Sequence, residues 1–564
     1  MDKKMIPIGV SNFYDMQTMN YYYVDKSNFI KDLLNNLSAV TLFTRPRRFG
    51  KTLNMNMLME FLDIKKDSKE LFKGLNIEKE TILCEKWQNK YPVIFISLKE
   101  VEGLNFESAL DELKIVIANL YKNYSYLLKN KELDEDDIES FKQIKTAKSS
   151  ITDIKQSLQL LTRLLYQHYN QKVVILIDEY DVPLQKASIN GYYEYMLDII
   201  RAMMNKAFKD NPYLSFGVIT GCLRVSKESI FTGFNNLRVC TISDTDFSGY
   251  FGFTQGEVFE MLKYYNFEDK METVKYWYDG YLFGNTEIYC PFSVINYVRD
   301  LISSRDTEPK NYWVNSSSND IIKSFIIKAD ENTLEEFKAL IQGKNIIKPI
   351  TETLTYAEIN KNIDNLWSML YISGYLTKVK HIQENLFELR IPNEEVKEVF
   401  ISKINDWFKE EIFEENADVL KELCIALKEG KAKTAESRFN KILRKSMSLR
   451  DIQTQTKKEV VYHSIFLGAL NRYENWEVNS NFEAGEGYAD IVVKDFKAGK
   501  GFIIEFKNAI SEKELDKEIE RAFMQIEDKK YTQAIQEEDI KEIYLYAVAC
   551  YNKMCKIEMK KMQK

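Results

Sequence analysis

Four short runs of consecutive apolar residues in the first 240 residues constrain the fold of this chain most strongly. They cover residues 39–44, 93–98, 173–177 and 214–220. Val, Ile, Leu and Phe occupy successive rather than alternating positions, which is typical of strands buried on both faces of a parallel sheet. Helical patterns separate the runs and fit right-handed crossover connections. The sequence therefore predicts an α/β fold, a parallel sheet with helices on both faces.

Length and composition bound the remaining possibilities. A chain of 564 residues is too long for one ordinary core, so several domains are expected. The net charge of −7 gives no support to a general nucleic-acid-binding surface, but it leaves a local basic groove open. The sequence lacks a run of 18 apolar residues and an apolar signal-peptide core. We therefore expect no membrane partner and a cytoplasmic location.

Cysteine and histidine usage indicates which metal sites to expect. The seven cysteines are scattered along the chain without a Cys-x-x-Cys pair. This predicts reduced thiols, and it argues against a disulfide framework or structural zinc. The three histidines lie far apart in sequence, so any metal should be held mainly by oxygen.

The pattern of residue types changes twice after the first 240 residues. Aromatic-rich helices and loops begin near residue 241, and amphipathic helices follow from about 320 to 450. The aromatic residues of 277–283 could stack on bases, but at this spacing core packing is favoured. Residues 421–445 form a charged helical pattern that could link to the last domain. From about residue 460 the pattern predicts helix, strand, turn, strand, helix, strand.

A candidate phosphate-binding loop follows the first apolar run. Such a loop needs a strand, a tight turn and a helix N-terminus, with a Lys for the β/γ-phosphates and a Thr hydroxyl for Mg²⁺. Lys51 and Thr52 follow Gly50 and begin a good helical pattern. Arg45 replaces the first glycine of the usual pattern, while Pro46 can rigidify the loop. The alternative is a glycine turn before a helix with a solvated lysine.

Acidic residues at the end of the 173–177 run strengthen the nucleotide interpretation. We expect Asp178 to lie opposite the Thr52 hydroxyl at Mg²⁺, and Glu179 to polarise the attacking water. Thr220 ends the next run and can hydrogen-bond water or phosphate. Arg224 can neutralise transition-state charge, in its own subunit or a neighbour. The alternatives are an acidic solvated turn, a capping threonine and a surface arginine. The residues expected to bind the nucleotide are Arg47, Arg48, Phe49, Gly50, Lys51, Thr52, Asp178 and Thr220.

A second candidate site lies near the C-terminus. Asp490 stands beside one apolar run, and Glu505 and Lys507 stand on the next. Strand alternation places Glu505 and Lys507 on the same face. Phosphodiester cleavage with Mg²⁺ needs carboxylates for the metal, here Asp490 and Glu505, and a Lys near the attacking water. A Glu-x-Lys triplet alone also occurs by chance, and the preceding Asp490 makes the pattern more specific.

Four segments of the chain together resemble the predicted AAA-ATPase-like family, which is often fused to a PD-(D/E)XK nuclease-like domain. They are residues 44–52, 177–181, 220–230 and 277–281. The resemblance covers about residues 5–315 and 455–560. It implies an archaeal or STAND-type P-loop ATPase, a helical or winged-helix-like middle region and a restriction-endonuclease-like α/β domain. Arg45 fits the family's Arg-Pro-Arg-Arg loop. The implied domains are 1–240, P-loop ATPase-like; 241–450, helical lid and linker; and 455–564, nuclease-like.

The resemblance also implies further site residues. Gln525 would assist the C-terminal site from a helix. Glu459 could add a carboxylate, although a solvated helix face shared with His463 is slightly preferred. Tyr488 stands where relatives often have Arg, which weakens the expectation of phosphate-backbone contact.

The expected function is an ATP-dependent control of a C-terminal Mg²⁺-dependent nuclease. The cofactors would be ATP and Mg²⁺, with Mn²⁺ as an alternative metal. The partner would be nucleic acid, with DNA favoured over RNA, and homo-oligomerisation is left open. The rival hypothesis is a nucleotide-dependent switch whose nuclease-like domain binds without cutting, which the acidic net charge and Tyr488 favour.

Overall fold

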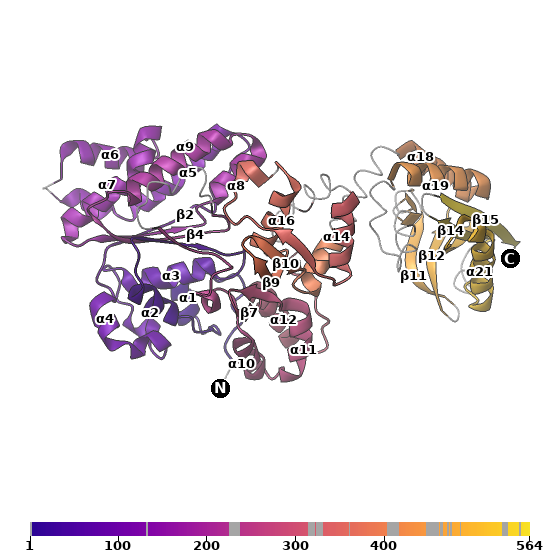
Figure 1. Cartoon of the computed structure of the whole chain (residues 1–564), viewed down its shortest axis with the longest axis horizontal. Helices are drawn as coiled ribbons and strands as arrows, with labels where there is room; N and C mark the ends of the chain where they lie inside the picture. Colours follow the sequence, from indigo (N-terminus) through magenta and orange to yellow (C-terminus); the bar gives the residue numbers. More distant parts are fainter. Residues whose placement is uncertain are drawn as a thin grey trace. The chain divides into compact units, whose positions relative to one another are not determined.

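The computed structural model (Figure 1) describes most of the chain as two compact units. The described segments are residues 3–130, 133–224, 237–313, 331–359, 361–402, 417–446, 476–484, 487–532, 540–551 and 554–563, with isolated positions between them. The first unit contains Met1–Phe325 and Gly343–Val399, and the second contains Ile326–Gln342 and Phe400–Lys564.

A five-stranded parallel sheet forms the centre of the first unit. Its strand order is β2-β3-β4-β1-β5, with β1 and β4 side by side. The strands are β1 (Val40–Thr44), β2 (Val93–Ser97), β3 (Val173–Asp178), β4 (Leu214–Gly221) and β5 (Leu237–Cys240). Every residue of β1 and β3 is buried. The four apolar runs are therefore the four predicted strands, and β5 is an additional strand that pairs with β1.

Helices cover both faces of this sheet, as Figure 1 shows. One layer contains α1 (Phe13–Thr18), α2 (Asn28–Asn35), α3 (Lys51–Leu62) and α4 (Thr81–Trp87). The other contains α5 (Phe106–Lys122), α6 (Glu135–Lys145), α7 (Ile151–Tyr169), α8 (Val182–Asn190) and α9 (Tyr193–Phe208). Capping boxes at Asn105 and Ser150 satisfy the first backbone N–H groups of α5 and α7. The predicted α/β arrangement of this region is confirmed.

The rest of the first unit is mainly helical, as predicted. It contains α10 (Gln255–Tyr265), α11 (Met271–Tyr278), β6 (Tyr281–Phe283), β7 (Thr286–Ile288), α12 (Pro291–Ser303), β8 (Ile346–Pro349), α15 (Tyr356–Ile359), α16 (Ile363–Ile372), β9 (Thr377–Gln383) and β10 (Leu386–Arg390). Strands β8, β10 and β9 form an antiparallel sheet. Tyr278, Tyr281 and Phe283 are buried, and Phe49 packs on Tyr281 and Phe283. These aromatic side chains therefore pack in the core.

The second unit is a mixed sheet with helices. The sheet order is β11-β12-β13-β14-β15, and only β13 and β14 run parallel among the described pairs. Its elements are α14 (Glu331–Ile341), α18 (Ala417–Lys428), α19 (Ala432–Ser446), β11 (Glu477–Ala484), β12 (Gly487–Asp495), β13 (Lys500–Asn508), α21 (Leu515–Asp528), β14 (Glu542–Tyr551) and β15 (Met554–Gln563). The predicted C-terminal α/β fold is confirmed, with two strands, β11 and β15, beyond the predicted pattern. Short 3₁₀ turns complete the two units.

Residues 421–445, predicted as a charged helical stretch that could link to the last domain, are helical and lie in two helices. Gly430, at a φ of +71°, lies between α18 and α19. A left-handed residue ends a helix readily when it is glycine. Leu423 of α18 and Phe439 of α19 are fully buried in the same hydrophobic cluster as the sheet residue Phe506. These helices therefore form part of the core of the second unit.

A disulfide joins Cys550 and Cys555, which corrects the prediction that all thiols are reduced. The two residues face each other across the antiparallel pair β14 and β15, with their Cα atoms 4.0 Å apart. The prediction was wrong because it considered cysteine spacing without the hairpin that brings the pair together. The other five cysteines are free. No helix among the described residues is long and apolar enough to cross a membrane.

Candidate functional site

The loop between β1 and α3 is the centre of the N-terminal candidate site. Gly50 adopts a φ of +81°, a left-handed conformation that favours glycine, and α3 begins at Lys51. The Lys51 Nζ atom donates to the carbonyl oxygens of Arg45 and Pro46, both at 3.1 Å. The lysine therefore folds back over its own loop and places its charge at the N-terminus of α3.

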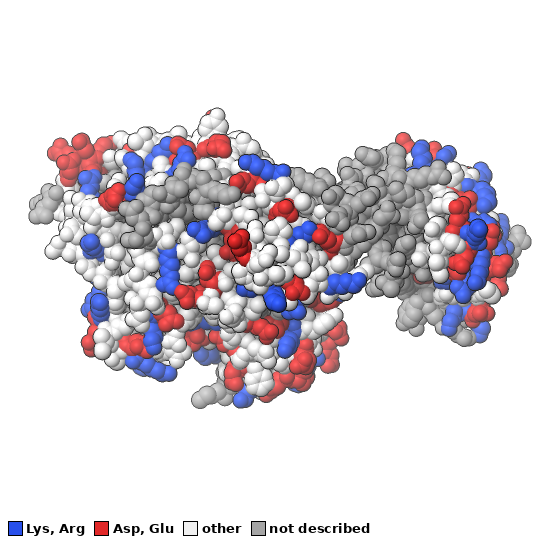
Figure 2. All heavy atoms as spheres, viewed as in Figure 1, with Lys and Arg blue, Asp and Glu red and all other residues white. Residues whose placement is uncertain are grey.

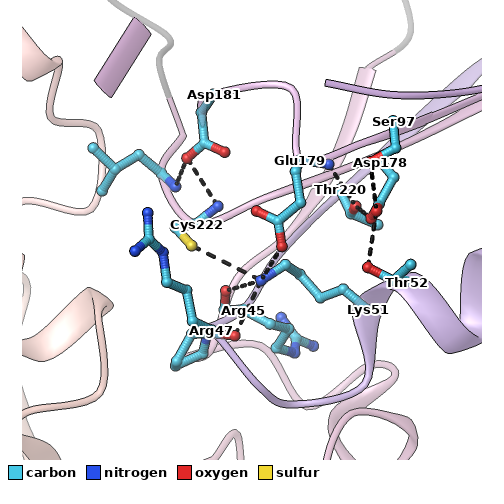
Figure 3. A network of polar contacts seen from close by, with 12 residues as sticks. Arg45, Arg47, Lys51, Thr52, Ser97, Asp178, Glu179, Asp181, Thr220 and Cys222 are labelled. Carbon is cyan, nitrogen blue, oxygen red and sulfur yellow. Dashed lines mark hydrogen bonds and ion pairs between the residues drawn. The ribbon is translucent and has the colours of Figure 1, made fainter. Parts of the chain in front are cut away.

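Asp178 lies at the centre of a hydroxyl cluster beside this loop (Figure 3). The Thr52 hydroxyl donates to Asp178 Oδ2 at 2.8 Å, and the Thr220 hydroxyl donates to Oδ1 at 2.6 Å. Ser97 donates to Oδ2 at 3.2 Å. Ser97, Asp178 and Thr220 meet because β2, β3 and β4 are neighbours and end at the same edge of the sheet, while Thr52 comes from the first turn of α3. Burial raises the pKa of Asp178, although the Thr220 hydrogen bond opposes the shift.

Glu179 and Lys51 form an ion pair at the same edge. Glu179 Oε1 lies 3.2 Å from Lys51 Nζ, and the Glu179 N–H donates to the Thr220 hydroxyl at 3.3 Å. Glu179 has a φ of +53°, so its backbone is strained for a residue with a side chain. Burial alone would lower the pKa of Lys51, but nearby Cys222 and Glu179 raise it above the ordinary lysine value.

Arg45 is buried, which explains how the loop accommodates an arginine in place of its first glycine. Its side chain is fully buried and donates to the carbonyl oxygens of Thr44 at 2.9 Å and Cys240 at 2.8 Å. Its guanidinium carbon lies 5.1 Å from the ring centre of Phe251 and 5.6 Å from that of Phe283. Burial lowers the pKa of Arg45 to about 10. Arg45 therefore joins the loop to β5 and to the aromatic core.

The next two arginines have partners of their own. Arg47 donates to the side-chain oxygen of Gln185 on α8. The Arg48 guanidinium lies 3.7 Å from the ring centre of Phe292, a short cation–π distance. Both side chains stay beside the loop, so their charge is available near an anion bound there.

Asp181 holds the residues that follow β4, and sequence reasoning assigned it no role. Its Oδ2 atom accepts the N–H groups of Cys222 and Leu223, both at 2.9 Å. Tyr180 donates to the Leu223 carbonyl at 2.7 Å. Arg224 comes next, and its buried Nε has no hydrogen-bond partner among the described residues. Residues 225–230 of the predicted motif lie outside the described part of the chain.

A cavity of about 290 Å³ adjoins the loop. Residues 48–54 form one wall, and Glu179 contributes to it. Its lining also includes the aromatic residues Tyr22, Tyr250, Phe253 and Phe292. Aromatic walls next to a cationic loop suit a ligand with a flat apolar part and an anionic part.

The C-terminal candidate residues also lie together. Lys507 Nζ is 2.8 Å from Glu505 Oε1, on the shared strand face that alternation predicts. The Phe506 N–H donates to Asp490 Oδ2 at 2.7 Å, which places the Asp490 carboxylate beside β13. Glu505 is 1% exposed, and its Oε2 has no hydrogen-bond partner among the described residues. Burial, with Asp490 as a further cause, raises the pKa of Glu505 to about 7.

Tyr531 belongs to this cluster and was missed by sequence reasoning. Gln525 on α21 donates from Nε2 to the Tyr531 hydroxyl at 3.0 Å. Burial raises the pKa of Tyr531, and Glu505 and Asp490 add to the shift, so the tyrosine lies within electrostatic reach of both carboxylates. Gln525 is thus connected to the site through Tyr531. The position of Tyr531 just after α21 was the available signal.

The carboxylates of the second unit fit a divalent metal. The orphaned, buried Oε2 of Glu505 beside a second carboxylate suits an oxygen-preferring cation. Among the described residues, however, no group of three or more His, Cys, Asp or Glu residues could hold a metal. Mg²⁺ commonly binds through one or two carboxylates and keeps several waters, so two carboxylates fit it. Glu459, His463 and the side chain of Tyr488 lie outside the described residues.

Comparisons with known proteins find matches for both ends of the chain. Residues 7–231 match the family described as predicted AAA-ATPase, and residues 457–560 match the PD-(D/E)XK nuclease superfamily. An Azotobacter chroococcum mcd 1 protein, described as an uncharacterized protein in the vnfD 5′ region, is 25% identical over 402 residues. The alignment covers 70% of this chain and 69% of that protein. The recognition of an AAA-ATPase-like region and a nuclease-like region is confirmed.

Proposed function

We propose that this chain binds and hydrolyses ATP and thereby controls a C-terminal Mg²⁺-dependent DNA or RNA phosphodiesterase. The observation that carries the nucleotide part is the meeting of Lys51, Thr52, Asp178 and Glu179 at one edge of the parallel sheet. The family match over residues 7–231 supports it.

The proposed roles follow from the contacts of each side chain. The N-terminus of α3 and Lys51 would bind the phosphates, because backbone N–H groups and a cation converge there. Thr52 and Asp178 would hold Mg²⁺, which neutralises phosphate charge when bound. Glu179 would orient the attacking water once phosphate replaces it as the partner of Lys51. The aromatic walls of the adjoining cavity would take the base.

The proposed nuclease part rests on the second unit. Asp490 and Glu505 would hold Mg²⁺ or Mn²⁺, which supplies charge stabilisation and a more acidic bound water when present. Lys507 would carry positive charge beside the scissile phosphate, and Tyr531 and Gln525 would order the surroundings. Figure 2 shows acidic and basic side chains interspersed on the visible face of the second unit, as on that of the first. A nucleic acid would therefore depend on local contacts rather than on a broad basic field.

One observation favours a second candidate, a nucleotide-dependent switch that binds nucleic acid without cutting it. Lys507 pairs directly with Glu505, one of only two carboxylates at the site among the described residues. A cation already paired with a ligand carboxylate weakens a metal site unless the metal displaces it. Metal titration distinguishes the two candidates.

The test uses the purified full-length chain with labelled DNA and RNA, Mg²⁺ or Mn²⁺, and ATP present or absent. Wild type is compared with Lys51→Ala, Glu505→Ala and Lys507→Ala, and with Glu512→Ala as the control at an exposed acid of the second unit. We expect cleavage to vanish in Glu505→Ala and Lys507→Ala. We expect Lys51→Ala to abolish only the effect of ATP.

The other outcomes are equally informative. Cleavage that survives in both Glu505→Ala and Lys507→Ala contradicts the proposed nuclease site. Intact ATP hydrolysis without cleavage or metal binding under any condition favours the non-cutting switch. Cleavage that is indifferent to ATP contradicts the proposed control.

A further inference from the structure

The segment after Thr220, residues 221–224, contacts the phosphate-binding loop through Gly221 and Cys222. The Cys222 sulfur lies 3.8 Å from Lys51 Nζ, and Cys222 and Leu223 are both buried. Arg224, the candidate for charge stabilisation, follows directly. Any shift of this segment therefore moves Cys222 relative to Lys51 and moves Arg224 with it.

Two side chains from the end of β3 hold the segment. Asp181 accepts the N–H groups of Cys222 and Leu223, and Tyr180 donates to the carbonyl of Leu223. The fit is close, because a Cβ added at Gly221 would lie 2.6 Å from the Tyr180 ring and 2.7 Å from Asp181 Oδ1. Asp181 itself is 1% exposed. The segment can therefore move only if Asp181 moves or its hydrogen bonds break.

A third residue reaches Asp181 from a distant part of the chain. The Tyr356 hydroxyl donates to Asp181 Oδ2 at 3.0 Å, across 175 sequence positions. Tyr356 opens the short helix α15, and its carbonyl accepts from Ser188 of α8 at 3.4 Å. The preceding Thr355 is held by its bond to Glu358 at 3.2 Å. The Tyr356 hydroxyl is thus held in place by the contacts of α15.

We propose that Asp181 and Tyr356 are positioning residues that hold the 221–224 segment against Lys51 and thereby set the rate of ATP hydrolysis. The inference rests on the proposed ATPase activity and adds to it a control by the part of the chain that carries α15. The Tyr356 hydroxyl fixes the Asp181 carboxylate, and the carboxylate fixes two consecutive N–H groups. Arg224 and Cys222 are then placed correctly in the transition state, where a small displacement has large effects on rate.

The test is a double-mutant cycle in the full-length chain with Tyr356→Phe, Asp181→Asn and the double variant. Tyr371→Phe is the matched control. Tyr371 is also a buried tyrosine of the 343–399 segment, but its hydroxyl hydrogen-bonds to the Ser243 hydroxyl at 2.9 Å instead of to Asp181. ATP affinity is measured by equilibrium binding, and kcat and KM by steady-state phosphate release. Melting temperatures verify that each variant folds.

We expect Tyr356→Phe to lower kcat about tenfold, the loss expected for a hydrogen bond to a charged group, with ATP affinity changed less than about twofold. Tyr371→Phe should retain the wild-type kcat. The double variant should lose no more than Asp181→Asn alone, because Tyr356 acts through Asp181. A merely structural tyrosine would lower stability and affinity together and would add to Asp181→Asn.

The outcomes separate this inference from the proposed function. Wild-type hydrolysis with equal kcat in Tyr356→Phe and Tyr371→Phe overturns the inference alone. Additive losses in the double variant overturn it as well. If wild type neither binds nor hydrolyses ATP, the proposed function fails and the inference fails with it. Should Tyr356→Phe not fold, the kcat of Asp181→Asn at unchanged ATP affinity decides the role of the carboxylate.

Discussion

At the scale of single residues, the neighbouring acids Asp178 and Glu179 of the first unit lie in different environments. Asp178 accepts three side-chain hydroxyls, whereas Glu179 faces Lys51 across 3.2 Å. The three hydroxyls hold the Asp178 carboxylate in one orientation, as outer-shell hydrogen bonds do for carboxylates that bind metals. A carboxylate in a single ion pair can exchange its partner, which suits a group that orients water after phosphate arrives.

This difference predicts the effect of Glu179→Gln. The neutral amide keeps the size of the side chain but cannot accept a proton, so we expect kcat for ATP to fall about 100-fold or more. Nucleotide binding should persist, because Lys51 and Thr52 remain. Phosphate release and equilibrium binding measure the two effects, with the exposed Glu194→Gln on α9 as the control. A variant with normal kcat would show that Glu179 is not the water-orienting group.

Glu505 gives a pH-dependent prediction in the second unit. Burial, with Asp490 nearby, raises its pKa from 4.5 to about 7. Between these values the folded state binds more protons than the unfolded state, so this group's contribution to stability falls as pH rises through the window. Metal binding needs the ionised form, so it should strengthen over the upper part of the same range.

We therefore expect Mn²⁺ affinity without nucleotide to rise about tenfold from pH 6 to pH 8, as the ionised fraction of Glu505 increases. Titration calorimetry of wild type and Glu505→Gln measures this, with Glu512→Gln as the exposed control. Glu505→Gln should lose the binding at both pH values. A pH-independent Mn²⁺ affinity in wild type would contradict the assigned role of Glu505.

At the scale of elements, strands buried on both faces were the easiest to predict from sequence. β1 and β3 consist of consecutive buried residues, a pattern that an amphipathic element does not produce. β15 escaped prediction because only one of its faces is buried. Cys555 and Ile557 are buried, while Lys556 and Lys560 pair with Asp516 and Glu527 on α21. In the sequence, Cys555, Met559 and Met562 are spaced i, i+4 and i+7, which also fits a helix.

The residues of the candidate sites also differ in how well the sequence predicts them. Lys51 and Thr52 could be singled out because they follow a glycine at the start of a helical pattern, and Asp178 because it directly follows an apolar run. The contact between Asp181 and Tyr356 could not, because it depends on packing between elements 175 positions apart. Local pattern locates a strand end, and tertiary packing decides which distant side chain reaches it.

The close packing of α9 on β4 predicts that a side chain at Gly217 of β4 lowers stability. A Cβ added at Gly217 would lie 2.3 Å from the ring of Phe208, so the glycine permits close approach of the helix end. We expect Gly217→Ala to lower the free energy of unfolding by about 1–3 kcal/mol through overpacking. Denaturant unfolding measures it, and Phe208→Leu in the same chain should recover part of the loss.

Gly256→Ala is the matched control for that substitution. Gly256 lies in the first turn of α10, and a Cβ there would meet no atom within 4 Å. Alanine should leave stability unchanged or raise it by about 0.5–1 kcal/mol, the helix-propensity difference. Equal effects of both substitutions would show that the contact with Phe208 does not decide the cost at Gly217.

At the scale of the whole molecule, two compact units with separate cores predict two unfolding transitions. A ligand that binds only the folded state stabilises the unit that holds its site, by about 2.7 kcal/mol at 100 times its Kd. ATP should therefore raise the transition of the first unit, and Mn²⁺ at pH 8 should raise that of the second. Differential scanning calorimetry of the full-length chain measures both.

The proposed control adds a stricter requirement to this experiment. If ATP changes the activity of the second unit by changing its affinity for metal or nucleic acid, those ligands must change ATP affinity by the same factor. ATP then also shifts the unfolding transition of the second unit, by a smaller amount, and this shift measures the coupling free energy between the two units. Lys51→Ala should remove the ATP-induced shifts of both transitions. ATP shifts confined to the first transition, with ATP affinity unchanged by DNA, would mean that the two units bind their ligands independently.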